Sequence, residues 1–409
     1  MTQYSYFDNA ATTRCCEKAS EALKLFAYDE FGNPSSPHVR GQAAAKAINE
    51  AREYFASYFQ VNENQVIFTG SGTESDNLAI LGSTRPHLET LIKNLKNGTK
   101  VLPPRVITST IEHPAVTNAV ESLESLGFEI VKLPVTQEGQ VDENDLLDAV
   151  NDQTVLISIQ RVNNIIGSIL DVEHLATIAK EKNPNLIFHS DCIQAFAKVP
   201  VPSSSSKIDL VSISAHKIEG PKSIGALIVL NQEILTRNKL RPIVFGGGQE
   251  FGLRSGTQSP GLISAFHVAA KEAISSQRQR MESIRNLRNE FLKSLKSRNL
   301  IGGREAVFKV NSPPDGVANI LSLSTYELPA GPLQRMLEER GCLVATGSAC
   351  SSSKSNPDPV LTAIGNDRRK ARWAIRVSFS SNNTLEEVNR LSNAIFDSVD
   401  AMTRLLTGA

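Results

Sequence analysis

The sequence predicts an α/β fold, with a large domain built on a mostly parallel sheet and a smaller α+β domain after it. First, apolar runs typical of strands alternate with helical patterns as far as about residue 255. Second, runs such as IDLVSIS and IGALIVL are apolar at successive positions, as strands covered by helices on both faces must be. Third, the alternation stops beyond residue 300, where a few strands and two helices remain.

The elements of the large domain follow one another in a regular order. QVIFTG (65–70) precedes the helical ESDNLAIL, and RVITST (105–110) precedes a helical segment that Pro114 is suited to begin. FEIVKLP, TVLISIQ, LIFHSD, IDLVSIS and IGALIVL follow as strands, several of them separated by helices such as VEHLATIAKEK. Residues 260–299 have apolar positions spaced for one long helix, with a break along it left open.

The remaining pattern predicts the small domain. VANILSLS and AIRVSFS are strand-like, whereas PLQRMLEER and TLEEVNRLSNAIFDSVDAMTRLL have helical spacing. We therefore expect a large domain over residues 15–255, a long connecting helix over 256–300, and a small C-terminal domain over 301–409.

Composition and charge argue against several classes of function. The chain carries 43 basic and 43 acidic side chains, a balance that disfavours direct nucleic-acid binding. No apolar stretch approaches the roughly 20 residues that cross a bilayer, and the opening residues lack a secretory signal, so we expect a cytoplasmic protein with no membrane partner. The five cysteines form no C-x-x-C pair and have no histidine at metal-ligand spacing, so neither a disulfide framework nor a metal site is predicted.

One lysine stands in an unusual place. Lys217 follows the apolar run IDLVSIS almost directly, on a short loop that Gly220 and Pro221 hold in place. Lysines normally lie on solvated surfaces, where the ammonium group keeps its water. A lysine presented at the end of a core strand therefore indicates a chemical role, and its neighbours define that role.

Three further stretches fall where strands end, which is where doubly wound sheets bind ligands. GSGTES (70–75) has the composition of a phosphate cradle at a helix N-terminus, although a glycine-rich turn explains it equally well. His113 in EHPAV follows the next strand, and a lone histidine is more often structural than catalytic. Asp191 ends LIFHSD, where a carboxylate needs a hydrogen-bonding or charged partner; its plainer role is a cap for a following helix.

Together these residues describe a site for pyridoxal 5′-phosphate (PLP). PLP requires a lysine for its Schiff base, an anion that keeps its ring nitrogen protonated, a flat side chain over the ring, and donors for its phosphate. Lys217, Asp191 and His113 would supply the first three. The phosphate donors would be Gly72, Thr73, Ser214 and His216.

With these residues in place, the sequence resembles the class V aminotransferase family, and within it the cysteine desulfurases of the group I type. The resemblance implies the PLP-dependent transferase fold type I, in which the N-terminal segment 1–14 joins the small domain. The subfamily assignment depends mainly on TGSACSSS. The resembling motifs span nearly the whole chain: YFDNAATT (6–13), FGNPSSPH (31–38), VIFTGSGTES, EHPAV, VNNIIG (162–167), DCIQAFAK, SISAHKIEGPKSIGAL, GGGQEFGLRSGT (246–257), TGSACSSS (346–353) and AIRVSFS (374–380).

The resemblance also implies roles for four more residues. Gln194 would hydrogen-bond the ring hydroxyl of PLP, and Asn164 would lie near that hydroxyl and the substrate carboxylate. Arg376 would bind the carboxylate with its planar fork of donors. Thr257 would reach a phosphate in the neighbouring subunit, which implies a homodimer. The family's Asn-Asn-Glu-Ile-Gly differs here, because Ile165 replaces the glutamate.

Cys350 is the expected nucleophile. It lies among the small polar residues of ATGSACSSSKSNPDP, a composition that predicts an exposed loop, and Lys354 would favour its thiolate. Cys342, in contrast, lies in an apolar run. We therefore expect a cysteine desulfurase that converts L-cysteine to L-alanine, with Lys217 and His113 moving protons. The sulfur would pass as a persulfide on Cys350 to an acceptor such as an iron–sulfur scaffold or a thiolation protein.

The sequence leaves two other kinds of function open. A selenocysteine lyase or another class V enzyme, such as an aminotransferase, would share the cofactor site, but transamination does not need Cys350. A scaffold that binds partners without turnover would not need Lys217, Asp191 and Arg376, all of which are present.

Overall fold

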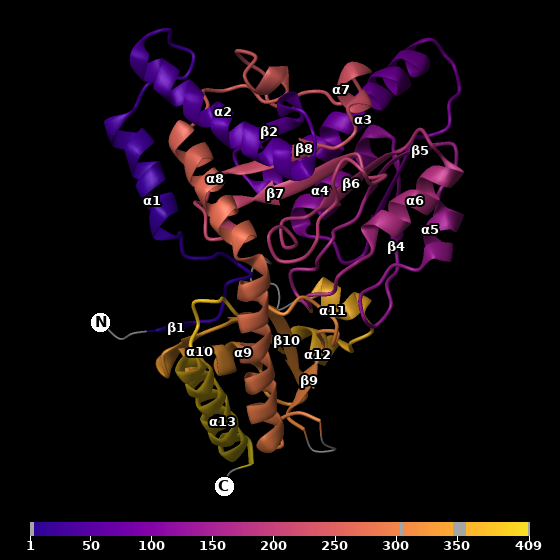
Figure 1. Ribbon diagram of the computed structural model, residues 1–409. Helices are drawn as coiled ribbons and strands as arrows, with labels where there is room; N and C mark the ends of the chain where they lie inside the picture. Colours follow the sequence, from indigo (N-terminus) through magenta and orange to yellow (C-terminus); the bar gives the residue numbers. More distant parts are fainter. Residues whose placement is uncertain (1–3, 303–305, 347–356, 408–409) are drawn as a thin grey trace.

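A seven-stranded sheet forms the upper part of the molecule in Figure 1, and two smaller sheets lie below it. The computed structural model describes residues 4–302, 306–346 and 357–407. The strands of the large sheet, in spatial order, are β2 (Val66–Thr69), β8 (Gly225–Val229), β7 (Leu210–Ser214), β6 (Ile187–Asp191), β5 (Thr154–Ser158), β3 (Arg105–Ser109) and β4 (Glu129–Leu133).

Strand direction decides which side chains meet at the site. Strands β4, β3, β5, β6 and β7 pair in parallel, so their carboxyl ends lie at the same edge of the sheet. Strand β8 is antiparallel to both β7 and β2. The sheet is therefore mostly parallel, as expected. The antiparallel β8 was not foreseen from IGALIVL, because an apolar run indicates burial and not direction.

Helices cover both faces of this sheet, which explains why its strands are apolar throughout. Helices α3 and α4 pack on one face, and α2, α6 and α8 pack on the other. None of the helices in the described part of the chain is long and apolar enough to span a membrane. The helices of this region are α1 (Glu17–Lys24), α2 (Val39–Phe59), α3 (Gly72–Lys96), α4 (Pro114–Ser122), α5 (Glu143–Ala149), α6 (Val172–Lys182), α7 (Glu233–Thr236) and α8 (Pro260–Ser275).

The expected long connecting helix is two helices. Helix α8 begins at Pro260 after the Ser259 cap, and α9 (Gln277–Ser297) continues downward in Figure 1 toward the smaller sheets. The break falls at Ser276, whose backbone leaves the helical region at φ −110° and ψ 9°. Its hydroxyl donates to the carbonyl of Glu272 at 2.6 Å. A serine hydroxyl that bonds four residues back competes with the helix and favours such a break.

The C-terminal region forms its own apolar core around a four-stranded antiparallel sheet of order β12-β13-β10-β9. The N-terminal strand β1 (Ser5–Tyr6) pairs in parallel with β11, and Phe7 lies in the same core. The elements of this region are β9 (Phe308–Val310), β10 (Ile320–Thr325), α10 (Ala330–Glu339), β11 (Cys342–Leu343), β12 (Ala345–Thr346), α11 (Pro359–Ala363), α12 (Arg368–Arg372), β13 (Ala374–Ser378) and α13 (Leu385–Thr407).

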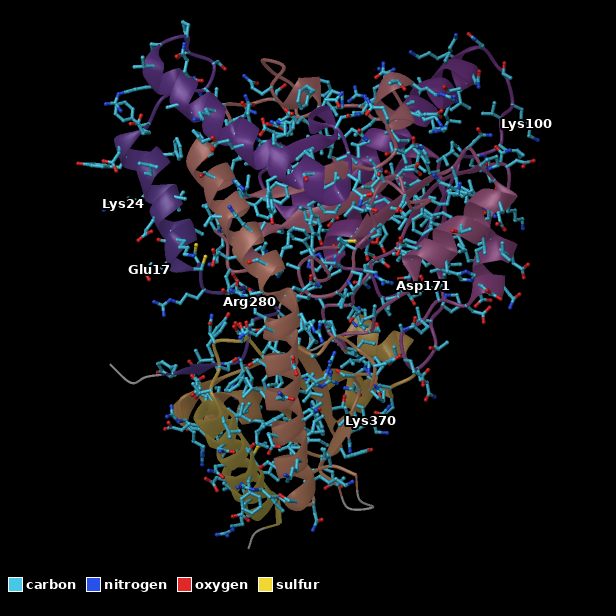
Figure 2. The ribbon with its side chains drawn as sticks, in the orientation of Figure 1. Glu17, Lys24, Lys100, Asp171, Arg280 and Lys370 are labelled. Carbon is cyan, nitrogen blue, oxygen red and sulfur yellow. The ribbon has the colours of Figure 1, made fainter. Side chains whose placement is uncertain are left out.

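The junction between the upper and lower parts carries polar contacts. Figure 2 labels Arg280, from the first turn of α9, at this junction. Its guanidinium lies 3.0 Å from the carboxylate of Glu219, which also accepts a hydrogen bond from Asn382 at 3.1 Å. Because Glu219 follows Lys217 by two residues, the loop that presents the lysine is anchored to both parts of the molecule.

Candidate active site

Lys217 lies one turn beyond the carboxyl end of a fully buried strand. Strand β7 ends at Ser214, and a single turn of 3₁₀ helix (Ala215–Lys217) follows it. The Nζ atom of Lys217 donates to the carbonyls of Ala10, at 2.9 Å, and Ala11, at 2.7 Å. The N-terminal motif YFDNAATT, more than 200 residues away in sequence, therefore lies directly against the lysine.

The turn before α3 packs closely against this strand end. A Cβ atom placed on Gly72 would lie 2.4 Å from Cδ1 of Ile193 and 3.2 Å from Cβ of Ser214. Only glycine fits there, so the N-terminus of α3 lies beside the residues that follow β6 and end β7. Thr73, the second residue of α3, is exposed. A helix N-terminus presents free N–H groups and the positive end of the helix dipole, which suits a phosphate.

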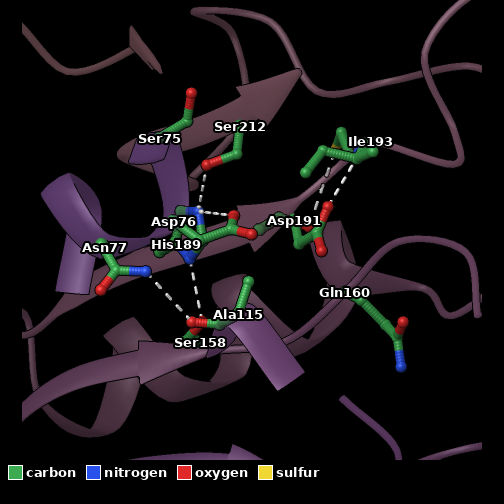
Figure 3. A network of polar contacts seen from close by, with 12 residues as sticks. Ser75, Asp76, Asn77, Ala115, Ser158, Gln160, His189, Asp191, Ile193 and Ser212 are labelled. Atoms are coloured by element: carbon green, nitrogen blue, oxygen red, sulfur yellow. Dashed lines mark hydrogen bonds and ion pairs between the residues drawn. The ribbon is translucent and has the colours of Figure 1, made fainter. Parts of the chain in front are cut away.

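Asp191 ends strand β6 with a nearly buried carboxyl group, which is 6% exposed. Its Oδ1 accepts a hydrogen bond from the backbone N–H of Ile193 at 2.8 Å, drawn in Figure 3. Burial raises the pKa of Asp191 to about 6, although the Ile193 N–H and the charge of Lys217 oppose this rise. The residues after Asp191 form turns and not a regular helix, so the plainer role of helix cap does not apply.

His113 is held in place as the N-cap of α4. Its Nδ1 accepts a hydrogen bond from the backbone N–H of Ala115 at 3.1 Å. Burial lowers the pKa of His113 to about 4, and the positive charges of Lys217 and Arg376 lower it further. The imidazole is therefore neutral near neutral pH, with Nδ1 as an acceptor. The cap shows a structural role for His113, and its role over the cofactor ring stays a prediction that the cap does not oppose.

Arg376 reaches the site from the C-terminal sheet. It lies in the middle of β13 and is 4% exposed. Its Nη1 donates to the carbonyl of Asn164 at 2.9 Å, and its Nη2 lies 2.9 Å from Oδ1 of Asp8. Its Nε has no hydrogen-bond partner among the described residues. The guanidinium is thus fixed in orientation from two sides and keeps N–H donors for a ligand.

The other predicted residues differ in how close they come to this cluster. Gln194 donates through Nε2 to the carbonyl of Ala10 at 2.8 Å, the same carbonyl that Lys217 contacts. His216 has its Nδ1 3.2 Å from the Thr12 hydroxyl. Thr257 is exposed, on the segment before α8, and the described contacts do not join it to the cluster. Cys350 lies outside the described residues.

Four charged residues of this neighbourhood were missed in the sequence. Asp8 lies inside YFDNAATT and Glu112 directly precedes His113, so both stood in motifs that were noticed for other residues. Lys198 donates through Nζ to the carbonyl of Gln194 at 3.1 Å, and burial lowers its pKa to about 7. Asp76 in ESDNLAIL gave no signal, because a single acidic residue in a helix reads as a surface position.

The residues present fit PLP. Asp191 supplies a buried carboxylate with one backbone donor, Lys217 supplies a primary amine, and the start of α3 supplies free N–H groups beside Ser214. His113 contributes a neutral ring whose pKa both Lys217 and Arg376 depress, which places all three within electrostatic reach of one another. This set contains an anion for the ring nitrogen, an amine for the carbonyl and donors for the phosphate.

Comparisons with known proteins identify the family of this chain. The family model for aminotransferase class-V matches residues 5–391. The cysteine desulfurase IscS of Dictyoglomus turgidum is 37% identical over 95% of this chain and 93% of its own length. The cysteine desulfurase IscS of Methanosarcina thermophila is 34% identical over 98% of this chain and 93% of its own length.

Solved structures show the same relationship. A NifS-like protein aligns with a TM-score of 0.86 and 31% identity, over 97% of this chain and all of its own. The structure of SspA in complex with cysteine aligns with a TM-score of 0.76 and 32% identity, over 93% of this chain and 99% of its own. The chain belongs to the class V aminotransferase family and, within it, to the PLP-dependent cysteine desulfurases.

Proposed function

We propose that this protein takes sulfur from L-cysteine, releases L-alanine and holds the sulfur as a persulfide on Cys350. One observation carries the proposal: an amine, a buried carboxylate and an oriented guanidinium meet at the strand ends, on Lys217, Asp191 and Arg376. The structure of the relative SspA is described as a complex with cysteine, which supports the choice of substrate.

Each residue of the chain has a defined task in this reaction. PLP, when bound, withdraws electrons from the Cα atom of the amino acid. Asp191 would keep the ring nitrogen of bound PLP protonated. Because Asp191 is buried in a low-dielectric pocket, its attraction for that positive charge is stronger than it would be in water. Lys217 removes the Cα proton of the bound cysteine. His113, which is neutral near neutral pH, transfers a second proton close to Lys217. Arg376 binds the substrate carboxylate and thereby fixes the orientation of Cα.

Sulfur transfer itself requires a thiolate. The Cys350 thiolate attacks the substrate sulfur, and the Cβ–S bond breaks as the S–S bond forms. Cβ then gains a proton, and Cα regains the proton that Lys217 removed, which gives alanine. Two of the described thiols are poorly suited to this step, because burial raises the pKa of Cys342 to about 11 and that of Cys192 to about 12. Cys350, with small polar neighbours in the sequence, is the better candidate.

The proposal includes a homodimer. Large apolar side chains are exposed on the segment before α2 and on the segment before α8, where an isolated chain would leave them in water. Thr257 is exposed on the second of these segments, as a residue that completes a neighbour's phosphate site must be. Sedimentation of a fully active monomer would contradict this part. The exposed side chains are Tyr28, Phe31, Val39, Phe245 and Phe251.

The proposed acceptor is a protein thiol or scaffold that receives the sulfur from Cys350, in iron–sulfur cluster assembly or in tRNA thiolation in the cytoplasm.

Ile165, where the family has glutamate, is buried at 5% exposure in the core beneath the site. It belongs to the loop whose Asn164 carbonyl orients Arg376. An apolar side chain at this position secures the loop by packing instead of by charge.

The test is a cysteine comparison within the same chain. Cys350→Ser should bind PLP and L-cysteine, but the formation of alanine and of persulfide should fall together, because a hydroxyl stays protonated and attacks sulfur poorly. Cys16→Ser, at a half-buried position, is the control and should keep the wild-type rate. Mass spectrometry should find the added sulfur on Cys350. Wild-type alanine production by Cys350→Ser would instead indicate a lyase or an aminotransferase.

A further inference from the structure

A closed polar cluster lies on β5, β6 and β7 below the site, and it centres on His189. The Nδ1 of His189 is 2.9 Å from the Ser158 hydroxyl, and its Nε2 is 2.9 Å from the Ser212 hydroxyl. The Oδ1 of Asp76, from the second turn of α3, lies 3.7 Å from the same Nε2. Figure 3 shows this cluster beside Asp191. None of the reaction steps proposed above uses Asp76.

Asp76 is buried in a way that does not suit a carboxylate anion. Asp76 and His189 are both 0% exposed. Neither carboxyl oxygen of Asp76 has a hydrogen bond of good geometry among the described residues. The nearby Ser212 hydroxyl lowers the pKa of Asp76 to some extent, but it also contacts His189 and does not outweigh the effect of burial. A buried anion without donors is among the most costly arrangements in a protein, and it is relieved when the group takes up a proton.

His189 does not supply the missing positive charge. Both of its ring nitrogens contact serine hydroxyls, Ser158 on one side and Ser212 on the other. Complete burial lowers the pKa of His189 to about 3, so the ring is neutral near neutral pH. The ring and Asp76 therefore meet as two neutral groups, not as an ion pair, although one imidazole nitrogen and one carboxyl oxygen approach each other.

Asp191 is the acid that is equipped to carry a charge. It receives the Ile193 N–H at 2.8 Å and the favourable field of Lys217, whereas Asp76 has neither. Each of the two acids disfavours the charge of the other, and burial together with Asp191 raises the pKa of Asp76 well above its usual value. Glu112 faces the same region and would add to this repulsion if it were charged, but burial raises its own pKa to about 8, so it keeps its proton near neutral pH. One negative charge shared between Asp76 and Asp191 thus belongs on Asp191.

We propose that Asp76 stays protonated, so that the single negative charge of the buried pair resides on Asp191, the residue assigned to the ring nitrogen of the cofactor. This proposal rests on the proposed function in one respect, the role of Asp191 as the anion for the ring nitrogen. An ionised Asp76 would favour protonation of Asp191 and so weaken its hold on the ring proton. A neutral Asp76 keeps the volume of the pocket filled without that electrostatic penalty.

Infrared difference spectroscopy on the apoprotein tests the proposal without reference to sulfur transfer. Asp76→Asn keeps the size and the neutrality of the side chain. Near neutral pH the wild-type-minus-variant difference spectrum should show one positive band of a protonated carboxylic acid, which the variant lacks. It should show no carboxylate band. Asp191→Asn, the matched control, should lose a carboxylate band and leave the protonated band in place.

The titration midpoint of Asp191 gives a second measurement of whether Asp76 carries a charge. Removal of a neutral acid should leave that midpoint within a few tenths of a unit, whereas removal of a charge should lower it by about one unit or more. Loss of a carboxylate band in Asp76→Asn, or such a fall in the midpoint, would overturn the proposal. If Asp76→Asn does not fold, wild-type protein with ¹³C-labelled aspartate carboxyls, assigned through Asp191→Asn, reports the same protonation states.

Discussion

The sheet region and the C-terminal region bury different kinds of polar side chain. At the strand ends of the large sheet, Asp76, Glu112, His189 and Asp191 are all at most 6% exposed. Apart from the charge of Lys217 near Asp191, they face one another, neutral donors or no donor. In the C-terminal region the core is apolar, and the buried Asp358 accepts the N–H groups of Val360 and Leu361 as an ordinary helix cap. The sheet region therefore buries titratable side chains at its strand ends, whereas the C-terminal region buries mainly apolar side chains.

The exception in the C-terminal region is Arg376, and it points out of that region. Its two contacts run to Asp8 and to Asn164, not to its own sheet. Buried ion pairs elsewhere in the sheet region, such as Arg52 with Glu250 at 2.8 Å, have their charges paired with each other. Titratable groups left without such a partner gather at one edge of one sheet, which is the usual mark of a catalytic site. This contrast between the sheet region and the C-terminal region predicts that four substitutions affect activity or stability to different extents.

Lys217→Ala should have the largest effect. Removal of the amine should lower alanine production by about a thousandfold or more, because a positioned proton-transfer group alone contributes 10²–10⁴-fold. Borohydride reduction of the wild-type holoenzyme followed by peptide mapping should find PLP attached to Lys217. Lys222→Ala, an exposed neighbour, should retain both the adduct and the activity. An adduct on another lysine would remove Lys217 from the site.

Asp191→Asn should come next, with a loss in kcat on the order of a thousandfold, which corresponds to about 4 kcal/mol of barrier. The reason is that a neutral amide does not hold the ring proton. The sharpest comparison is with Asp76→Asn, the same chemical change in the same cluster, which should leave kcat near the wild-type value. Steady-state kinetics on the two variants measures this contrast, and equal losses would mean that the two acids are not distinguished.

Arg376→Lys tests the contribution of the C-terminal region and should be smaller. A lysine cannot keep both the Asn164 and Asp8 contacts while binding a carboxylate, so KM for cysteine should rise about 10- to 100-fold. The change in kcat should be slight, since the residues of the sheet region are intact. Arg372→Lys, at an exposed position, is the control. A fall in kcat with unchanged KM would place Arg376 in the chemistry instead.

Glu112→Gln should affect stability and its pH dependence only. Burial raises the pKa of Glu112 to about 8 from 4.5, so the folded state keeps a proton that the unfolded state releases over this range. This stabilising contribution is complete below pH 4.5 and is lost as the pH rises through about 8. The free energy of unfolding of Glu112→Gln, relative to wild type, should therefore increase by about 1–3 kcal/mol across that window.

Urea denaturation of the apoprotein at the two ends of this range measures the effect on Glu112. Exposed Glu124→Gln is the control and should show no such change, because its carboxyl group is solvated in both states. Parallel behaviour of Glu112→Gln and wild type at both pH values would mean that Glu112 is ionised in the folded protein. Glu112 would then be a charged group beside Asp76 and Asp191, not a neutral one.

Much of the fold and the centre of the site could be predicted from the sequence, because they depend on local patterns. Apolar runs at successive positions indicated strands covered on both faces, and Lys217 and Asp191 were recognisable because each stands directly after such a run. Direction was harder to predict. IGALIVL forms a strand as expected, but its antiparallel pairing with β7 and β2 depends on partners that the run itself does not name.

The sequence by itself therefore determined the family, the cofactor and the residues that a motif carries, since those require only residue type and order. The tertiary structure alone decided which charges are buried and what faces them. Asp76 in ESDNLAIL reads as a helix surface residue, yet α3 packs that side chain against His189, more than a hundred residues later. Asp8 and Arg376 come from opposite ends of the chain. Burial and charge pairing depend on how all elements pack together, and no local pattern encodes that.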